Sequence, residues 1–278
     1  MMQEMRPAWS SQFTQGKLEK IDLIQPLENI SWDEACGNGT GKGIKVAIID
    51  SGIDAAHPAL SGPVNGYATV EMDDDAVHYV TEPHEDSCGH GTACAGIIRS
   101  LAPECEIYSV KVLGKGLMGR GNTFIAGLRW AVENNMDVCN LSLGTTKKVF
   151  FSALHEVADL AYFKNVILVT AANNLPIASF PSMYASVISV AAHEEEQDAL
   201  RFYYNPAPPI EFGAPGINVR VAWLDQQWIT ATGNSFAAPH ITGIVTKILS
   251  AHRDLTPFQM KTILRALSAN AHKIPGDR

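Results

Sequence analysis

The chain has 278 residues, of which 46% are hydrophobic and 18% are charged, and its formal net charge is -8. This composition excludes a disordered chain, and the length allows one large core. The acidic balance argues against nucleic acid as a partner, because nucleic-acid binding needs a clustered basic face. No stretch approaches the roughly 18 consecutive apolar residues of a membrane span, so no membrane partner is expected.

The cysteines and the N-terminal residues set an expectation for the compartment. Five cysteines leave at least one thiol unpaired in a monomer, and their spacing matches no zinc site. Free thiols are typical of reducing compartments. Residues 1–20 are polar and lack the apolar core of a signal peptide. We therefore expect a cytoplasmic location.

Short β-branched apolar runs predict strands that are buried on both faces. In chain order these runs are residues 45–49, 107–113, 137–143, 166–171 and 187–191. Helical patterns with one apolar face lie between them at residues 122–135 and 150–163. The alternation predicts an α/β fold: a three-layer, doubly wound, mostly parallel sheet with helices on both faces.

The C-terminal part predicts two helices. The first follows Ser235 and covers residues 236–250. The second has a strong start signal: Thr256 at the cap, Pro257 at the first helical position and Gln259 three residues after the cap. In open parallel sheets ligands bind outside the carboxyl ends of the strands. Asp50 directly follows the first predicted strand and is expected at such an end.

Three residues are candidates for chemistry, and each has an ordinary structural alternative. Asp50 is a rigidly held carboxylate that suits a partner for histidine, but taken alone such a residue is more often a turn or cap residue. His90 lies between two glycines at the start of a small-residue helix, where we expect it to be exposed in a cleft as a general base, with a purely structural histidine as an equal alternative. Ser235 lies where a helix start stabilises negative charge, although a serine there is often only a cap.

Together the segments DSGID at 50–54, GHGT at 89–92 and GNSFAAP at 233–239 resemble the three signature segments of the subtilisin family, in that family's order of Asp, His and Ser. The resemblance runs from about Ile24 to the end of the chain. It implies one subtilisin-like peptidase domain at residues 24–278, preceded by a lead-in of residues 1–23. The implied function is a serine endopeptidase acting on an extended peptide or protein.

The resemblance implies roles for single residues. Ser235 would attack the scissile carbonyl, His90 would take and return the proton, and Asp50 would orient the imidazole, so that the three form a catalytic triad. Residues 169–174 resemble the segment that ends in the oxyanion asparagine, which gives that role to Asn174. Asn173 stands where the family usually has glycine, and a plain pair of turn asparagines stays open as an alternative.

The substrate site is implied in the same way. Ser142, Leu143 and Gly144 resemble the edge that pairs with an extended peptide, and Leu117, Met118 and Gly119 resemble the opposing edge. Ser179 resembles the bottom of the first specificity pocket, beside a Phe180–Pro181 bond that is cis in the family. Leu175 and Pro176 predict an apolar pocket without strong charge selection.

The chain also departs from the family pattern. Asn234 replaces the usual threonine next to Ser235, and the loops after His90 and Asn174 are short. The loop after His90 lacks the strong calcium site of secreted relatives, so no cofactor is predicted. The sequence shows no inhibitory pro-segment before the domain, so we expect either that this segment has been removed or that the protein folds without it. The missing signal peptide and pro-segment favour the expectation of an enzyme that processes a peptide precursor. The alternative is a catalytically impaired module that keeps the fold and binds peptides. Cys94, one helical turn after His90, is expected to be a small core residue.

Overall fold

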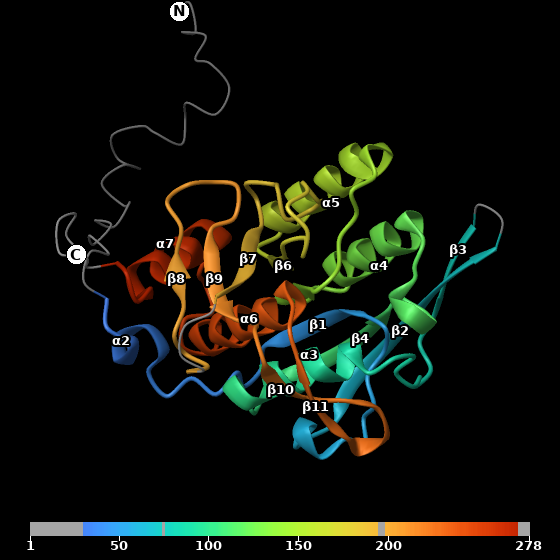
Figure 1. Cartoon of the computed structure of the whole chain (residues 1–278), viewed down its shortest axis with the longest axis horizontal. Helices are drawn as coiled ribbons and strands as arrows, with labels where there is room; N and C mark the ends of the chain where they lie inside the picture. The colour runs from blue at the N-terminus through green and yellow to red at the C-terminus, as the bar shows by residue number, and fades with distance from the viewer. Residues whose placement is uncertain (1–29, 74–75, 194–197, 272–278) are drawn as a thin grey trace, which may run out of the picture.

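The computed structural model of the chain describes residues 30–73, 76–193 and 198–271 (Figure 1). The predicted lead-in, residues 1–23, lies outside the described residues. In the described part, the main sheet has nine strands in the order β3-β2-β4-β1-β5-β6-β7-β9-β8. The strands are β1 Lys45–Asp50, β2 Val64–Asp73, β3 Ala76–Val80, β4 Glu106–Lys111, β5 Val138–Leu141, β6 Ile167–Ala171, β7 Ile188–His193, β8 Tyr203–Tyr204 and β9 Phe212–Pro215.

Every pairing from β2 through β9 inside this sheet is parallel, and antiparallel pairs occur only at its two edges, β2 with β3 and β8 with β9. Strand β1 lies between β4 and β5, so the chain builds the sheet first to one side of β1 and then to the other. Ligand sites form at the carboxyl end of a strand where the order switches in this way. Asp50, the last residue of β1, therefore lies at the switch point.

Helices cover both faces of the sheet, as Figure 1 shows. Val46 and Ile48 face one core, formed with α2 Trp32–Cys36, α3 His90–Leu101, α6 Asn234–Ala251 and α7 Pro257–Leu267. Ala47 and Ile49 face the other core, formed with α4 Gly121–Glu133 and α5 Phe151–Phe163. Alternate residues of one buried strand thus serve two layers. The predicted three-layer α/β fold is confirmed.

A small hairpin of β10 Val219–Ala222 and β11 Trp228–Ala231 packs over α3. Short 3₁₀ turns lie at η2 Pro58–Leu60, η3 Lys115–Leu117, η4 Lys148–Phe150 and η5 Leu224–Gln226. No helix in the described ranges is long and apolar enough to cross a membrane. All five cysteines are free.

The predicted elements are present, with corrections at their ends. The strand predicted at 107–113 ends at Lys111, because the N–H groups of Val112 and Leu113 both donate to the Asp50 carbonyl and turn the chain away. The helix predicted at 236–250 begins at Asn234, so Ser235 lies inside its first turn. The start of α7 is confirmed: Thr256 and Gln259 form a reciprocal capping box around Pro257.

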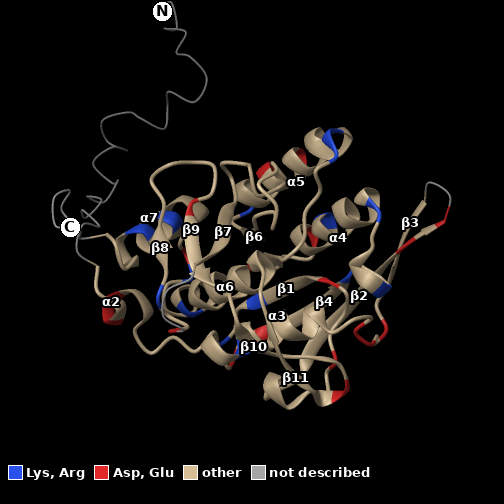
Figure 2. Cartoon of the chain, in the orientation of Figure 1, with Lys and Arg blue, Asp and Glu red and all other residues tan. Residues whose placement is uncertain are grey.

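Charged residues are found mostly on loops and helices, and the central strands of the sheet carry few of them (Figure 2). Of the described Asp, Glu, Lys and Arg side chains, three are buried: Asp50, Asp86 and Arg99. Burying an ionised group is costly unless it is paired or hydrogen-bonded. Two of these three, Asp50 and Asp86, lie near the junction where β1 ends and α3 begins. The residues at this junction must therefore supply hydrogen bonds to two buried carboxylates.

The close approach of α3 to the end of β1 gives a test of the fold. A Cβ at Gly91 would overlap the Gly52 carbonyl oxygen and lie 3.3 Å from the Asp50 Cβ. Alanine in a helix is normally favoured over glycine by about 0.5–1 kcal/mol, but this overlap outweighs that gain. We expect Gly91→Ala to lower the free energy of unfolding by about 1–3 kcal/mol in urea denaturation.

Gly62→Ala is the matched control. A Cβ there would meet the Arg99 guanidinium at an ordinary 3.6 Å, so the unfolding free energy should stay the same or rise slightly. Equal stability of the Gly91→Ala and Gly62→Ala proteins would contradict this packing.

Candidate active site

The Asp50 carboxylate is fully buried at the end of β1 and depends on protein partners. The Ser51 N–H donates to Oδ1 at 2.8 Å. The Nδ1 of His90 lies 2.8 Å from Oδ1 and 2.9 Å from Oδ2. An ionised carboxylate can only accept hydrogen bonds, so the imidazole proton is on Nδ1. The second ring nitrogen, Nε2, is then the one left to accept a proton.

A second buried carboxylate, Asp86, fixes the start of α3. Its Oδ1 accepts from the Ser51 hydroxyl at 2.7 Å and from the Gly89 N–H at 2.9 Å. Its Oδ2 accepts from the Thr92 N–H at 2.9 Å and from the Thr92 hydroxyl at 2.6 Å. These bonds satisfy N–H groups that a helix start leaves unpaired. The sequence analysis missed Asp86; an acidic residue just before a predicted helix start is the signal that would have found it.

His90 is the first residue of α3, and its environment raises its pKa. Burial opposes the charged imidazolium, but the Asp50 carboxylate, its hydrogen bond and the nearby Asp86 together raise the pKa of His90 above the ordinary 6.5. The expectation of an exposed histidine was wrong, because only 5% of His90 is accessible. The accessible part lines the cavity in which the other candidate residues meet.

Ser235 is held at that cavity by the first turns of α6. Pro239 lies inside the helix and has no N–H to donate to the Ser235 carbonyl four residues earlier. The Ser142 hydroxyl donates to that carbonyl instead at 2.8 Å, and the Cys94 thiol approaches it at 3.6 Å. Asn140 in turn donates to the Ser142 hydroxyl at 2.9 Å. The proline thus frees a carbonyl that ties α6 to the end of β5.

The two adjacent asparagines, Asn173 and Asn174, have different hydrogen-bond partners in the structure. Asn173 Oδ1 accepts from the Leu175 N–H at 2.8 Å, which makes it a local turn residue. Asn174 Oδ1 accepts from the Asn234 backbone N–H at 2.8 Å. A Cβ placed on Gly233 would lie 3.3 Å from the Ser235 Oγ and 3.5 Å from the Asn174 Nδ2. The amide donor of Asn174 and the hydroxyl of Ser235 therefore lie around one point, which Gly233 leaves open.

Asn234 anchors the loop that carries Asn174. Its side-chain Oδ1 accepts from the Ala192 N–H of β7 at 2.8 Å. Its Nδ2 donates to the Asn173 carbonyl at 3.0 Å and to the Ala172 carbonyl at 3.3 Å. An amide supplies the donor and the acceptor that these two elements need at once. The unusual asparagine beside Ser235 is thus a bridge from α6 to β7 and to the loop after β6.

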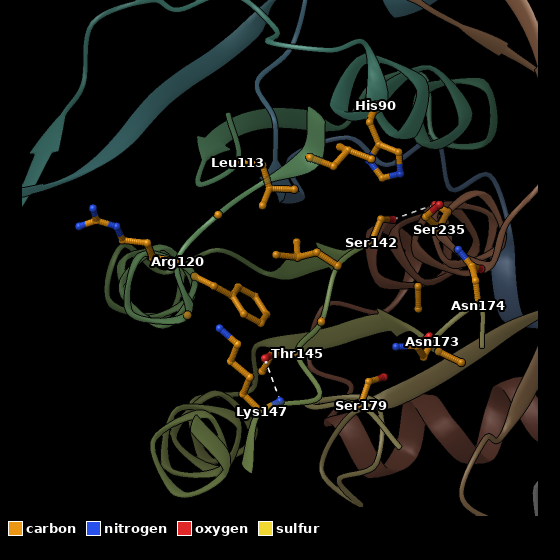
Figure 3. A pocket seen from close by; sticks show the side chains of 18 residues that line it. His90, Leu113, Arg120, Ser142, Thr145, Lys147, Asn173, Asn174, Ser179 and Ser235 are labelled. Atoms are coloured by element: carbon orange, nitrogen blue, oxygen red, sulfur yellow. Dashed lines mark hydrogen bonds between the residues drawn. The ribbon is translucent and has the colours of Figure 1, made fainter. Parts of the chain in front are cut away.

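Eighteen residues line one cavity of about 370 Å³, shown in Figure 3. His90 and Ser235 face each other across it, yet among the described residues no direct hydrogen bond joins the imidazole to the Ser235 hydroxyl. Such bonds are often long in ligand-free sites and tighten around substrate. Most other predicted site residues also line the cavity: Asn174, Ser142, Leu143, Gly144, Leu117, Gly119 and Ser179.

The lining of the cavity differs from the predicted substrate site in two places. Met118 is 76% exposed and does not line the cavity. Leu175 and Pro176 line a neighbouring hollow instead. The expectation of an apolar first specificity pocket without strong charge selection stays a prediction, and the two cations that line the cavity, Arg120 and Lys147, lie at the end away from His90 and Ser235.

The predicted cis bond between Phe180 and Pro181 is present. Next to it, Phe180 and Thr145 exchange two backbone hydrogen bonds, of 2.8 and 2.9 Å. This bridge holds the loop after β6 against the loop after β5 and places Ser179 at the wall of the cavity.

One group of metal-type ligands is close together in the part of the chain that the structure describes. The ligand atoms of Asp50, His90 and Cys94 lie within 4.8 Å of one another. Burial, the main cause, raises the pKa of the Cys94 thiol well above its ordinary value, and the Asp50 charge adds to this. A protonated thiol is a poor metal ligand. Cys94 therefore fits the predicted role of a small core residue.

The raised pKa of His90 can be measured directly. In an NMR titration of the imidazole resonances, assigned with His90→Gln, we expect a His90 pKa above 6.5. Asp50→Asn removes the carboxylate but leaves the burial, so the pKa should fall below 6.5. Asp54→Asn is the control, because the Asp54 carboxylate bonds the Ala56 N–H, and it should leave the titration unchanged. A wild-type pKa at or below 6.5 would contradict the pairing.

Known proteins resemble this chain in sequence. The model of the subtilase family matches residues 41–275. Minor extracellular protease Epr of Bacillus subtilis (strain 168) is 34% identical over 269 residues, which cover 92% of this chain and 38% of that protein. Subtilisin E of the same strain is 33% identical over 242 residues, which cover 82% of this chain and 61% of that protein. The chain therefore spans less than two thirds of the length of these two relatives.

Solved structures resemble it in fold. The S41 psychrophilic protease matches with a TM-score of 0.70 at 24% identity, over 81% of this chain and 83% of that one. A cold-adapted subtilisin-like serine proteinase matches with a TM-score of 0.66 at 24% identity, over 86% and 87%. At such identities the likeness concerns the fold. The family model matches most of the chain, and on that match the chain belongs to the subtilase family.

Proposed function

We propose that this chain is a serine endopeptidase that hydrolyses peptide bonds through an acyl-enzyme on Ser235. The observation that carries the proposal is the buried Asp50–His90 pair, whose free ring nitrogen faces the cavity that Ser235 also lines. Membership of the subtilase family supports the same reaction. The substrate class is an extended peptide or protein segment.

In the proposed reaction Ser235 Oγ attacks the scissile carbonyl while His90 Nε2 takes its proton. The tetrahedral intermediate collapses when the same nitrogen returns the proton to the leaving amine. Asp50 keeps Nδ1 protonated throughout and stabilises the imidazolium. Water then attacks the acyl-enzyme by the same route in reverse, and Ser235 regains its proton.

The oxyanion that forms at the carbonyl needs hydrogen-bond donors. Asn174 has its Oδ1 occupied by the Asn234 N–H, so its Nδ2 is the end that faces the substrate. The N–H of Ser235, in the first turn of α6, is the second proposed donor. It lies at a helix N-terminus, where backbone N–H groups are unpaired and the helix dipole favours negative charge.

For the biological substrate we propose a peptide precursor. The cavity lies open between two chain edges, Leu117–Gly121 on one side and Ser142–Thr145 on the other, and such a groove accepts an extended segment through backbone pairing. The expected cytoplasmic location and the expected absence of a strong calcium site stay predictions. The competing function is a peptide-binding module that has lost activity, and the missing hydrogen bond between His90 and Ser235 is the observation in its favour.

A fluorophosphonate probe separates the two functions. We expect the wild-type protein to take one covalent label, because an activated serine displaces the leaving group of the probe. Ser235→Ala and His90→Ala should take none, and Ser100→Ala, which removes a serine on α3 outside the cavity, should label as the wild type does. A wild type that is folded by circular dichroism but takes no label would rule out the endopeptidase and favour the binding module.

The oxyanion assignment predicts a graded loss of turnover. Asn174→Ala should lower kcat by about 10²–10³, the loss that removal of one such donor causes in a subtilisin, with little change in KM. Asn234→Ala keeps the backbone donor to Asn174 but removes the three neutral hydrogen bonds of the side-chain bridge, so we expect the looser Asn174 loop to lower kcat about tenfold.

Asn134→Ala serves as the control, because this exposed asparagine at the end of α4 bonds only the Trp130 carbonyl. Equal kcat values for the wild type and Asn174→Ala would refute the assignment. A rise in KM without a fall in kcat would assign Asn174 to substrate binding instead.

A further inference from the structure

The cavity has two chemically different ends. One end holds the candidate reacting groups: His90, Ser235 and Asn174, with Ser179 in the wall (Figure 3). The other end lies between the start of α4 and the turn before α5. The buried Phe124 of α4 and two cationic residues, Arg120 and Lys147, line this part of the cavity.

The charge of the far end is of one sign. Arg120 and Lys147 carry the only permanent charges among the residues that line the cavity, and no Asp or Glu lines it. This contrasts with the whole chain, whose formal net charge is -8. An acidic protein has many carboxylates available to pair with surface cations. Their absence from this wall therefore needs a reason other than overall composition.

Neither cation is neutralised within the described ranges. Arg129 pairs with Glu133 and Glu156, and Lys261 pairs with Glu211. Arg120 and Lys147 have no such partner in the structure that is described. The dashed contact at Lys147 in Figure 3 is its backbone N–H, which donates to the Thr145 hydroxyl at 3.2 Å and does not involve the side-chain ammonium group.

The position of the cations on the helices adds to the positive potential. Arg120 is the residue before α4, and Lys147 precedes the turn that leads into α5. Neither helix has an acidic residue in its first turn. Basic residues at a helix start are unfavourable, because the unpaired N–H groups there already carry positive partial charge. A local departure from the stabilising pattern is typical of functional positions.

The lining of the cavity also includes an aromatic side chain, that of Phe124. An apolar wall together with two cations fits a substrate side chain that has a methylene stem and a carboxylate tip. Glutamate and aspartate have that form, and a carboxylate is the partner that guanidinium and ammonium groups bind best.

We propose that this enzyme selects substrates with an acidic side chain on the acyl side of the scissile bond, held at the far end of the cavity by Arg120 and Lys147. The inference rests on the proposed function, because that function places the scissile carbonyl at Ser235 and leads the preceding residues along the Ser142–Gly144 edge. The charge selection lies several substrate residues from the reacting bond, while the end next to Ser179 carries no charge.

Peptide pairs that differ in one group test the proposal. A series of peptides carries either Glu or Gln at one of the positions from the second to the fifth before the scissile bond. At one or two of these positions we expect kcat/KM for the Glu peptide to exceed that for the Gln peptide about five-fold at low salt. Raising the NaCl concentration from about 0.05 M to about 0.5 M should shrink the ratio, because the charges are exposed.

Charge-removing variants assign the effect to the two residues. Arg120→Gln and Lys147→Gln should each lower the Glu/Gln ratio, and the double variant should bring it close to one. Lys42→Gln is the matched control, since Lys42 is exposed and lies outside the cavity, and it should keep the wild-type ratio. A ratio of one at every position, or a ratio that survives in the double variant, would overturn the proposal.

A binding measurement distinguishes this failure from failure of the proposed function. With Ser235→Ala, the dissociation constants of the intact Glu and Gln peptides can be measured by calorimetry without any cleavage. Tighter binding of the Glu peptide that Arg120→Gln and Lys147→Gln abolish supports charge selection. Equal binding overturns it. Absence of both fluorophosphonate labelling and cleavage refutes the endopeptidase, whichever peptide binds better.

Discussion

The Asp50 carboxylate is a charge with no access to water, and much of the site follows from the way that charge is satisfied. Its acceptor oxygens fix the proton of His90 on Nδ1 and so leave Nε2 for the cavity. The interaction requires α3 to begin close against the end of β1, which explains the glycine at position 91 and the second carboxylate, Asp86, that holds the helix start. Position, tautomer and raised pKa of the histidine thus share one electrostatic cause.

Backbone groups that regular structure leaves unpaired hold the remaining segments together. Pro239 releases the Ser235 carbonyl, and Ser142 at the end of β5 binds it. The Asn234 N–H, free at the start of α6, binds Asn174, while the Asn234 side chain reaches the loop after β6 and β7. Each bridge joins elements far apart in sequence with a bond that a single side chain supplies. The result is a preorganised site, in which donors are in place before charge develops.

Sequence patterns were sufficient for the layers and for the three central residues, because burial of apolar runs and the order of the DSGID, GHGT and GNSFAAP segments are local signals. Features that depend on tertiary contacts could not be predicted from the sequence. The choice between Asn173 and Asn174 depends on which amide meets the Asn234 N–H. The burial of His90 depends on packing around Asp50. The cationic end of the cavity forms because the fold brings the starts of α4 and α5 close together. Arg120 and Lys147 are far apart in the sequence, so no local pattern predicts that they line one cavity.

The central claim is that Asp50, His90, Asn174 and Ser235 form one preorganised centre for attack on a carbonyl. A crystal structure with a peptide boronic acid tests this most directly, since a boronate mimics the tetrahedral intermediate. The account predicts a bond from boron to Ser235 Oγ, one boronate oxygen about 2.7–3.1 Å from Asn174 Nδ2 and another within hydrogen-bond distance of His90 Nε2. A boronate bound elsewhere, or an Asn174 amide turned away from it, would contradict the account.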